Sequence, residues 1–244
     1  MDKGCIYYTD FYASPLILQV CQKQLRESFN GEIISVSLNK PLDFGKNIVL
    51  KNKKRSYLTM VYQIILGLEN SSANYVFFTE ADVLYHKSHF DFMPSKDDIF
   101  YYNTNNWRWK YPYDLLITYD NLVSLSSLCV YRKLALDHYK KRLELIERNN
   151  WNENKSREPY WIRRIGYEPG NKSKRQELIP TNGCDYWKSK YPNIDIRHSK
   201  TFSPPKVSLD NFKHPPTNWI EKNIDEIPGW GLRKVFPEGM KKLC

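Results

Sequence analysis

The sequence predicts an α/β protein in which a mainly parallel sheet is flanked by helices. Strand-like and helix-like apolar patterns alternate along its first part, the arrangement that gives parallel strands joined by crossover helices. One strand-like segment, residues 75–79, is apolar throughout, as expected of a strand covered on both faces. Hydrophobic residues make up 41% of the chain and aromatic residues 15%, enough for the 244 residues to fold as one domain.

The elements expected before residue 80 follow from local patterns. Apolar runs predict three strands, and apolar residues at helical spacing predict two helices between them. In chain order these are a strand at 5–9, a helix at 16–25, a strand at 32–38, a helix at 57–68 and a strand at 75–79. Residues 46–55 are polar and basic and are expected to form a loop, after which Ser56 is suited to cap the second helix.

The pattern beyond residue 80 is less regular. Residues 98–103 and 122–131 have the composition of strands, and residues 132–149 show the charged amphipathic pattern of a helix. From about residue 180, prolines interrupt the sequence repeatedly. We therefore expect residues 180–244 to form a loop-rich extension packed on the domain that residues 1–179 build.

The N-terminus and the cysteines predict a cytoplasmic protein. The first residues lack the basic stretch and long apolar run of a signal peptide, and no segment approaches the ~20 apolar residues of a membrane span. The five cysteines are odd in number, scattered and without a CxxC pair. We expect reduced thiols and no integral membrane association.

The positive charge is concentrated in the second part of the chain. The formal net charge is +10: residues 1–100 hold 11 Lys and Arg against 11 Asp and Glu, whereas residues 101–244 hold 26 against 16. A basic surface suits a polyanion such as nucleic acid, an anionic membrane face or an acidic glycan. A Lys-rich surface that only keeps the protein soluble explains the same counts equally well.

Two carboxylates, Glu80 and Asp82, directly follow the apolar strand at 75–79. Ligands bind beyond the carboxyl ends of parallel strands, and side chains at i and i+2 of an extended segment project to one side. Such a pair can bind Mg²⁺ or Mn²⁺, which prefer oxygen ligands and accept substrate phosphates at their remaining positions. Taken alone, the pair is also typical of a solvated loop or a helix cap.

The sequence EADVLY, which begins at Glu80, resembles the acidic DxD-type motif of nucleotide-sugar-dependent glycosyltransferases with the GT-A fold, as do the strand and helix before it. The resemblance covers residues 6–89 well and continues more loosely to residue 198. It implies a GT-A-like catalytic domain over residues 1–179, with a nucleotide-sugar half at 1–100 and an acceptor half at 101–179. It also implies a nucleoside-diphosphate sugar, such as a UDP-sugar, as donor and Mn²⁺ or Mg²⁺ as cofactor.

The resemblance assigns donor-binding roles to two places. Tyr8, Thr9 and Asp10, at the end of the first strand, match the place that holds the base and ribose of the donor. Arg55 and Ser56, at the start of a helix, match the position that contacts the donor, where a guanidinium and a helix N-terminus both favour a diphosphate.

The metal ligands that the resemblance implies are Asp82, Glu80 and His198. Glu80 departs from the usual first Asp, which leaves open whether it binds the metal or only a neighbouring group. Ala81, between the two carboxylates, falls in the donor-binding loop. His198 matches the late His or Asp that many such enzymes bring to the metal, although an isolated histidine is more often structural. His86 and His89 follow the motif at helical spacing; either lines the site or is satisfied by Asp91 or a backbone carbonyl.

The acceptor side rests on the sequence EPYWIRRIGY, which begins at Glu158 and resembles the acceptor motif of inverting GT-A enzymes. A carboxylate there can remove the proton from an acceptor hydroxyl, so Glu158 is the first candidate base and Glu168 the second. Pro159 suits the first turn of a helix, so a role for Glu158 in stabilising that helix explains the sequence about as well.

The expected function is that of a metal-dependent glycosyltransferase that moves a sugar to a hydroxyl acceptor, with inversion or retention left open. The basic, Trp-containing region 101–244 favours double-stranded DNA carrying a 5-hydroxymethylated pyrimidine as the acceptor. One alternative is a bacterial enzyme that builds a surface glycan or a lipid-linked sugar, its basic patch resting on anionic lipid. A second alternative is a nucleic-acid-binding protein without catalysis.

Overall fold

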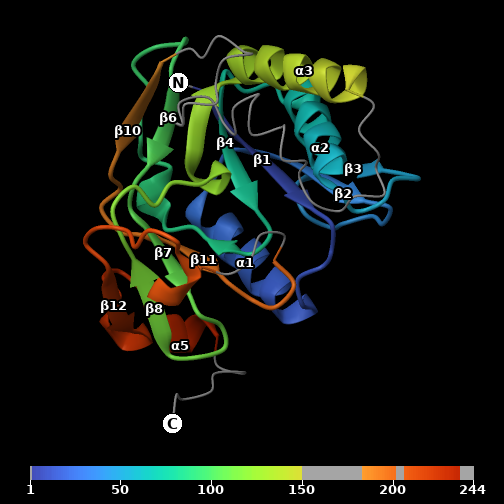
Figure 1. Cartoon of the computed structure of the whole chain (residues 1–244). Helices are drawn as coiled ribbons and strands as arrows, with labels where there is room; N and C mark the ends of the chain where they lie inside the picture. Colours follow the sequence, from blue (N-terminus) through green and yellow to red (C-terminus); the bar gives the residue numbers. More distant parts are fainter. Residues whose placement is uncertain (1, 150–182, 202–205, 237–244) are drawn as a thin grey trace.

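The computed structural model describes residues 2–149, 183–201 and 206–236. A seven-stranded mixed sheet forms the centre of the molecule (Figure 1). Across the sheet its strands are β10 (Cys184–Trp187), β6 (Phe100–Asn103), β9 (Leu128–Tyr131), β4 (Tyr75–Glu80), β1 (Lys3–Thr9), β2 (Glu32–Leu38) and β3 (Lys46–Leu50). Strands β3, β2, β1 and β4 are parallel, whereas β9 runs antiparallel to both of its neighbours. The predicted α/β class, with a mostly parallel sheet flanked by helices, is confirmed.

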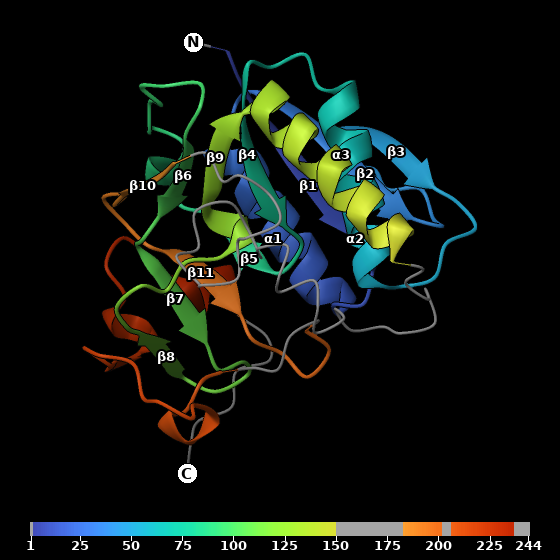
Figure 2. The same ribbon diagram turned by 45° about the horizontal axis from the view of Figure 1, so that its top comes forward.

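Helices cover both faces of this sheet. Helix α1 (Pro15–Ser28) lies on one face, and α2 (Tyr57–Asn70) and α3 (Arg132–Arg148) lie together on the other, as Figures 1 and 2 show from two directions. The predicted cap of α2 is confirmed: the Ser56 hydroxyl accepts a hydrogen bond from the Thr59 backbone N–H at 3.1 Å. Helix α1 begins at Pro15. Proline suits the first helical turn because an N–H at this position would have no acceptor within the helix, so its absence costs nothing.

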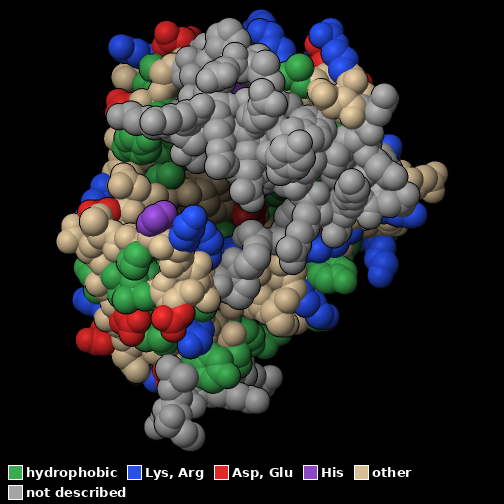
Figure 3. Space-filling view, in the orientation of Figure 1, with side chains coloured by type: hydrophobic (Ala, Val, Ile, Leu, Met, Phe, Trp, Pro, Cys, Tyr) green, Lys and Arg blue, Asp and Glu red, His purple; other side chains and the backbone are tan. Residues whose placement is uncertain are grey.

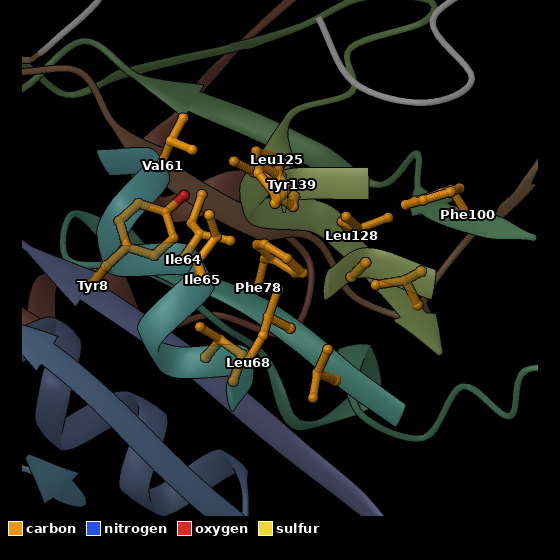
Figure 4. Close-up of a cluster of buried hydrophobic side chains, with 14 of the residues drawn as sticks. Tyr8, Val61, Ile64, Ile65, Leu68, Phe78, Phe100, Leu125, Leu128 and Tyr139 are labelled. Atoms are coloured by element: carbon orange, nitrogen blue, oxygen red, sulfur yellow. The ribbon is translucent and has the colours of Figure 1, made fainter. Parts of the chain in front are cut away.

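The core between the sheet and the helices α2 and α3 follows from the alternation of side chains along the strands and from the helical spacing of apolar residues in α2 and α3. Alternate residues of β1 and β4, including Tyr8 and Phe78, face these helices and pack against the stripe that includes Ile64 (Figure 4). The Phe78 and Tyr139 rings stack at 5.8 Å, which joins β4 to α3. The intervening residues of β1 and β4, such as Phe77, face α1 and belong to a separate cluster.

A second, five-stranded sheet lies beside the first. Its strands, in order, are β12 (Ile220–Asn223), β8 (Leu115–Thr118), β7 (Asn106–Trp109), β11 (Asn193–Ile196) and β5 (Val83–Leu84). Its apolar face packs on Ile17 and Cys21 of α1, so α1 is shared between the two sheets. The strand β5 begins directly after Asp82, which ties the end of β4 to this second sheet.

Three expectations from the sequence are corrected. Residues 46–55 are not all loop, because Lys46–Leu50 is the edge strand β3, paired with β2. Within residues 122–131 only Leu128–Tyr131 is a strand, preceded by the 3₁₀ turn Leu125–Ser127. Beyond residue 182, in the extension expected to be rich in loops, three short strands join the two sheets and a short helix, α5 (Leu232–Val235), packs against the apolar face of the second sheet.

Two further observations concern membrane-spanning helices and the cysteines. The helices of the described ranges include none that is both long enough and apolar enough to cross a bilayer. Cys5, Cys21 and Cys129 are buried free thiols, and Cys184 is a partly exposed one. Cys244 lies outside the described residues.

Candidate functional site

The candidate site lies where the carboxyl ends of β1 and β4 meet. The chain leaves β1 toward β2 on one side, whereas β4 occupies the other side of β1, so the strand order changes direction between these two strands. In open α/β sheets this is the place where ligands bind. Tyr8 and Glu80 are the last residue pair in the register of these two strands. Figure 3 shows a hollow near the centre of this face with acidic side-chain atoms at its floor.

The end of β1 is held by a buried amide. Gln63 of α2 donates from Nε2 to the carbonyl oxygens of Thr9 at 2.9 Å and Val36 at 3.0 Å. After Thr9 the chain turns through Phe11, whose φ of 59° is in the left-handed region. The Asp10 carboxylate closes this turn by accepting a hydrogen bond from the Tyr12 backbone N–H at 2.9 Å.

The residues at the start of α2 also contact the turn that follows β1. Arg55 donates from Nε to Oδ2 of Asp10 at 2.5 Å, and its Nη2 donates to the Lys200 carbonyl oxygen at 3.3 Å. Ser56 is buried, and its hydroxyl bonds to both the backbone N–H and the hydroxyl of Thr59. Of the two predicted donor contacts here, Arg55 is the residue whose charge lies at the site, and Ser56 organises the helix end.

Glu80 is fixed by two buried tyrosines. Its Oε1 accepts a hydrogen bond from the Tyr8 hydroxyl at 2.8 Å, and its backbone N–H donates to the Tyr85 hydroxyl at 3.0 Å. Burial, with the nearby Glu80 charge adding to it, raises the pKa of both tyrosines well above their usual range, so both hydroxyls keep their protons. Strand β4 ends at Glu80, and Ala81 and Asp82 form a turn. The expectation that Glu80 and Asp82 project from one extended segment was therefore wrong.

Asp82 lies beside His198. Strand β11 pairs antiparallel with β5, and the Ile196 backbone N–H donates to the Asp82 carbonyl oxygen at 2.9 Å. This pairing brings His198 Nε2 to 3.4 Å from Asp82 Oδ2. On the other side of the ring, His198 Nδ1 accepts a hydrogen bond from the Lys200 backbone N–H at 3.2 Å. Two predicted site residues, far apart in the sequence, are thus adjacent.

The contacts of these residues form a continuous chain around the site. It runs from Asp10 to Arg55, from Arg55 to the Lys200 carbonyl, from the Lys200 N–H to His198, and from His198 to Asp82. Four separate segments contribute: the end of β1, the start of α2, the turn after β11 and the turn after β4. The predicted residues Asp10, Arg55, Asp82 and His198 are therefore parts of one site.

The structure adds three charged residues that the sequence did not single out. Arg108 and Asp195 are paired in register across β7 and β11, on the face opposite the apolar one, with Arg108 Nε 3.8 Å from Asp195 Oδ2. Arg197 Nη1 donates to Asp195 Oδ2 at 3.2 Å. The alternation of Ile194, Asp195, Ile196 and Arg197 was the available signal, because it places both charges on one face.

Charges at the site act on one another through a partly desolvated environment. Burial raises the pKa of Asp195 despite the opposing charges of Arg197 and Arg108. Although burial alone would lower it, the charges of Asp195, Asp82 and Glu80 raise the pKa of Arg197. Arg197 therefore stays charged, and its charge interacts with the carboxylates of Asp82 and Glu80 as well as with that of Asp195.

The described residues bear on metal binding in two ways. They contain no group of three or more His, Cys, Asp or Glu side chains arranged to hold an ion. Mg²⁺ or Mn²⁺ does not need such a group, since one or two carboxylates together with substrate phosphates and water are sufficient. The Asp82 carboxylate, 22% exposed at the switch point of the sheet, fits that requirement, whereas one oxygen of Glu80 is already bonded to Tyr8.

Some predicted residues lie elsewhere. Glu158 and Glu168, the candidate bases, and the motif around them fall outside the described residues. His89 is fully buried; its Nδ1 accepts hydrogen bonds from the side-chain amides of Asn103 at 3.0 Å and Asn193 at 3.1 Å, and its ring stacks on Trp187. Burial lowers the pKa of His89 to about 3. His89 is a structural histidine and does not line the site.

Comparison with known proteins does not assign a family. No protein-family model matches the chain, and no curated protein matches it. Among solved structures the chain is similar to the crystal structure of Rv0371c from Mycobacterium tuberculosis H37Rv. The identity is 10% and the TM-score 0.38, over 56% of this chain and 75% of that one, a likeness too low to carry an argument.

Proposed function

We propose that this protein is a metal-dependent glycosyltransferase with a GT-A-like fold, which takes its sugar from a nucleoside-diphosphate sugar such as a UDP-sugar. The observation that carries the proposal is the convergence of Asp10, Arg55, Asp82 and His198 at the switch point between β1 and β4. The sequence predicts all four as parts of one donor site, and they come from four segments of the chain.

The charges of the site favour a diphosphate accompanied by a cation. Arg55 and Arg197 offer guanidinium groups, the groups best suited to phosphate oxygens. Glu80 and Asp82 would repel a diphosphate that approached without a counterion. A divalent ion held by Asp82 would supply positive charge against the leaving diphosphate.

The reaction needs one bond exchange and one proton acceptor. The bond between the sugar's anomeric carbon and the diphosphate oxygen breaks, and a bond from that carbon to the acceptor oxygen forms. The acceptor hydroxyl gives up its proton to a carboxylate, for which Glu158 and Glu168 are the candidates from the sequence. Arg55 and Arg197 stabilise the charge that grows on the leaving group.

The test is a screen of nucleotide sugars for Mn²⁺-dependent release of nucleoside diphosphate. We expect one donor to be turned over and Asp82→Asn to lower the rate at least ~100-fold, because the variant loses a charged metal ligand. The matched control is Asp137→Asn on the exposed face of α3, which should leave the rate unchanged. No release from any donor, or a wild-type rate in Asp82→Asn, would contradict the proposal.

For the acceptor we propose double-stranded DNA that carries a 5-hydroxymethylated pyrimidine. The net charge of +10 supports this, since phosphate contacts dominate affinity for DNA. Next to the site, the Tyr119 and Trp219 rings stack at 5.7 Å, and the Arg108 guanidinium lies 5.6 Å from the Tyr119 ring centroid. Rings combined with cations suit an exposed base and its backbone.

The acceptor is tested with labelled UDP-sugar, Mn²⁺ and three acceptors: hydroxymethylated DNA, plain DNA, and acidic lipid vesicles that contain a lipid-linked sugar. Transfer to hydroxymethylated DNA alone is the expected result. Transfer to the lipid arm would instead support an enzyme of surface-glycan synthesis. Donor hydrolysis without transfer to either DNA would count against the DNA acceptor.

A further inference from the structure

The orientation of the His198 ring is fixed by the turn that follows it. The Lys200 backbone N–H donates to Nδ1 at 3.2 Å, and Thr201 donates to the His198 carbonyl oxygen from both its backbone N–H at 3.2 Å and its hydroxyl at 3.1 Å. A ring nitrogen that accepts a hydrogen bond carries no proton. The proton of the neutral ring is therefore on Nε2, the nitrogen that faces Asp82.

This arrangement differs from that of a metal-binding histidine. A histidine that binds a metal through one nitrogen ordinarily donates the N–H of its other nitrogen to an oxygen acceptor. In His198 the second nitrogen accepts instead, so Nε2 has no lone pair to offer a metal. Within the described part of the chain, Nε2 is buried and has no hydrogen-bond partner, and the 3.4 Å to Asp82 Oδ2 is longer than an ordinary hydrogen bond.

We infer that His198 donates a hydrogen bond from Nε2 to a diphosphate oxygen of the donor and is not a ligand of the metal. This inference rests on the proposed donor site and assigns different tasks to its two neighbours: Asp82 binds the cation, and His198 binds the anion that the cation accompanies. The side chain of His198 is 8% exposed against 22% for Asp82, so its donor is largely desolvated, which strengthens a hydrogen bond to a charged acceptor.

Two variants separate the two nitrogens. His198→Asn places a side-chain oxygen near the position of Nδ1, where it can still accept from the Lys200 N–H, but it removes the Nε2 donor. His198→Gln reaches the Nε2 position with an amide donor and gives up the bond to Lys200. Circular dichroism and thermal unfolding establish that each variant is folded before ligands are added.

The measurements are the affinity for Mn²⁺ alone, by electron paramagnetic resonance, and the affinities for UDP and for inorganic pyrophosphate, by calorimetry at saturating Mn²⁺ or Mg²⁺. We expect Mn²⁺ affinity within about twofold of wild type in both variants. For UDP and pyrophosphate we expect a loss of about 10- to 100-fold in His198→Asn and a smaller loss in His198→Gln. Nitrogen-15 NMR of the His198 ring should show the Nε2–H form with and without Mg²⁺.

The outcomes distinguish this inference from the proposed function. If wild type binds UDP with Mn²⁺ but His198→Asn loses Mn²⁺ affinity tenfold or more, or binds UDP as wild type does, the inference is overturned and the donor site stands. If wild type binds pyrophosphate but shows no Mn²⁺-dependent binding of UDP or of any other nucleoside diphosphate, the proposed function fails. In that case a weaker affinity of His198→Asn for pyrophosphate still supports His198 as a hydrogen-bond donor to a bound anion. Binding of neither compound overturns both.

Discussion

The buried His89 gives a quantitative prediction about stability and pH. Its Nδ1 accepts hydrogen bonds from two asparagine side-chain amides, and the side chain is fully buried, so the folded protein holds this ring neutral. We consider the substitution His89→Asn, which removes the titrating group and leaves a side-chain oxygen near the position of Nδ1. The part of the free energy of unfolding that this substitution removes through lost packing is the same at every pH.

The magnitude follows from the two pKa values. Burial lowers the pKa of His89 from its ordinary 6.5 to about 3. Between pH 6.5 and pH 3 the His89 ring is protonated in the unfolded chain and neutral in the folded protein. The free energy of unfolding therefore falls as the pH falls through this range. The slope is about 1.4 kcal/mol per pH unit, which amounts to about 2 kcal/mol between pH 6.5 and pH 5.

The measurement is urea unfolding of wild type and His89→Asn, followed by tryptophan fluorescence at several pH values from 7.5 to about 5. Carboxylates and the buried His138 titrate equally in both proteins, so the difference between the two curves isolates His89. The stability advantage of wild type should shrink by about 2 kcal/mol over the lower part of this range. A difference that stays constant with pH would refute the description of His89 as a ring held neutral by burial.

Two further predictions concern the residues that support the candidate site. Gln63→Leu leaves the Thr9 and Val36 carbonyl oxygens without the amide that binds them, and should lower the free energy of unfolding by about 2 to 4 kcal/mol in urea titrations; an unchanged midpoint would contradict this. Arg55→Lys cannot keep both bonds of the guanidinium, so deuterium exchange around His198 should increase while global stability changes by less than about 1 kcal/mol. Unaltered exchange there would argue against the connected chain of contacts.

The first part of the fold could be predicted because its signals are local. The strand Glu32–Leu38 has the predicted bounds, and the Ser56 cap and the apolar run of β4 were recognised from a few adjacent residues. The order of these elements then placed Asp10 and Glu80 at one end of a parallel sheet. That part of the site could be predicted because the carboxyl ends of parallel strands lie at the same edge of a sheet.

The second sheet could not be predicted because its partners are distant and its strands are short. Strand β5 has only two residues, Val83–Leu84, which is too short for any period to appear, and it pairs with Ile194 and Asp195 more than a hundred residues later. The edge strand Lys46–Leu50 was missed for a related reason: its apolar run is only three residues long and leads directly into the polar, basic residues 51–55, so its pairing with β2 decides its structure.

The difference between Glu80 and Asp82 illustrates how the environment divides the work of two similar groups. Glu80 ends a strand, so both its backbone N–H and its carboxylate meet buried tyrosine hydroxyls, and its orientation is set before any ligand arrives. Asp82 lies in the turn, where its backbone carbonyl accepts a hydrogen bond from β11 and its carboxylate lies beside His198. The Glu80 carboxylate is bonded to the Tyr8 hydroxyl and orients the end of the strand, whereas the Asp82 carboxylate, 22% exposed, would be able to exchange water for a cation. Under the proposed function, we therefore assign the cation to Asp82 and the positioning of the turn to Glu80.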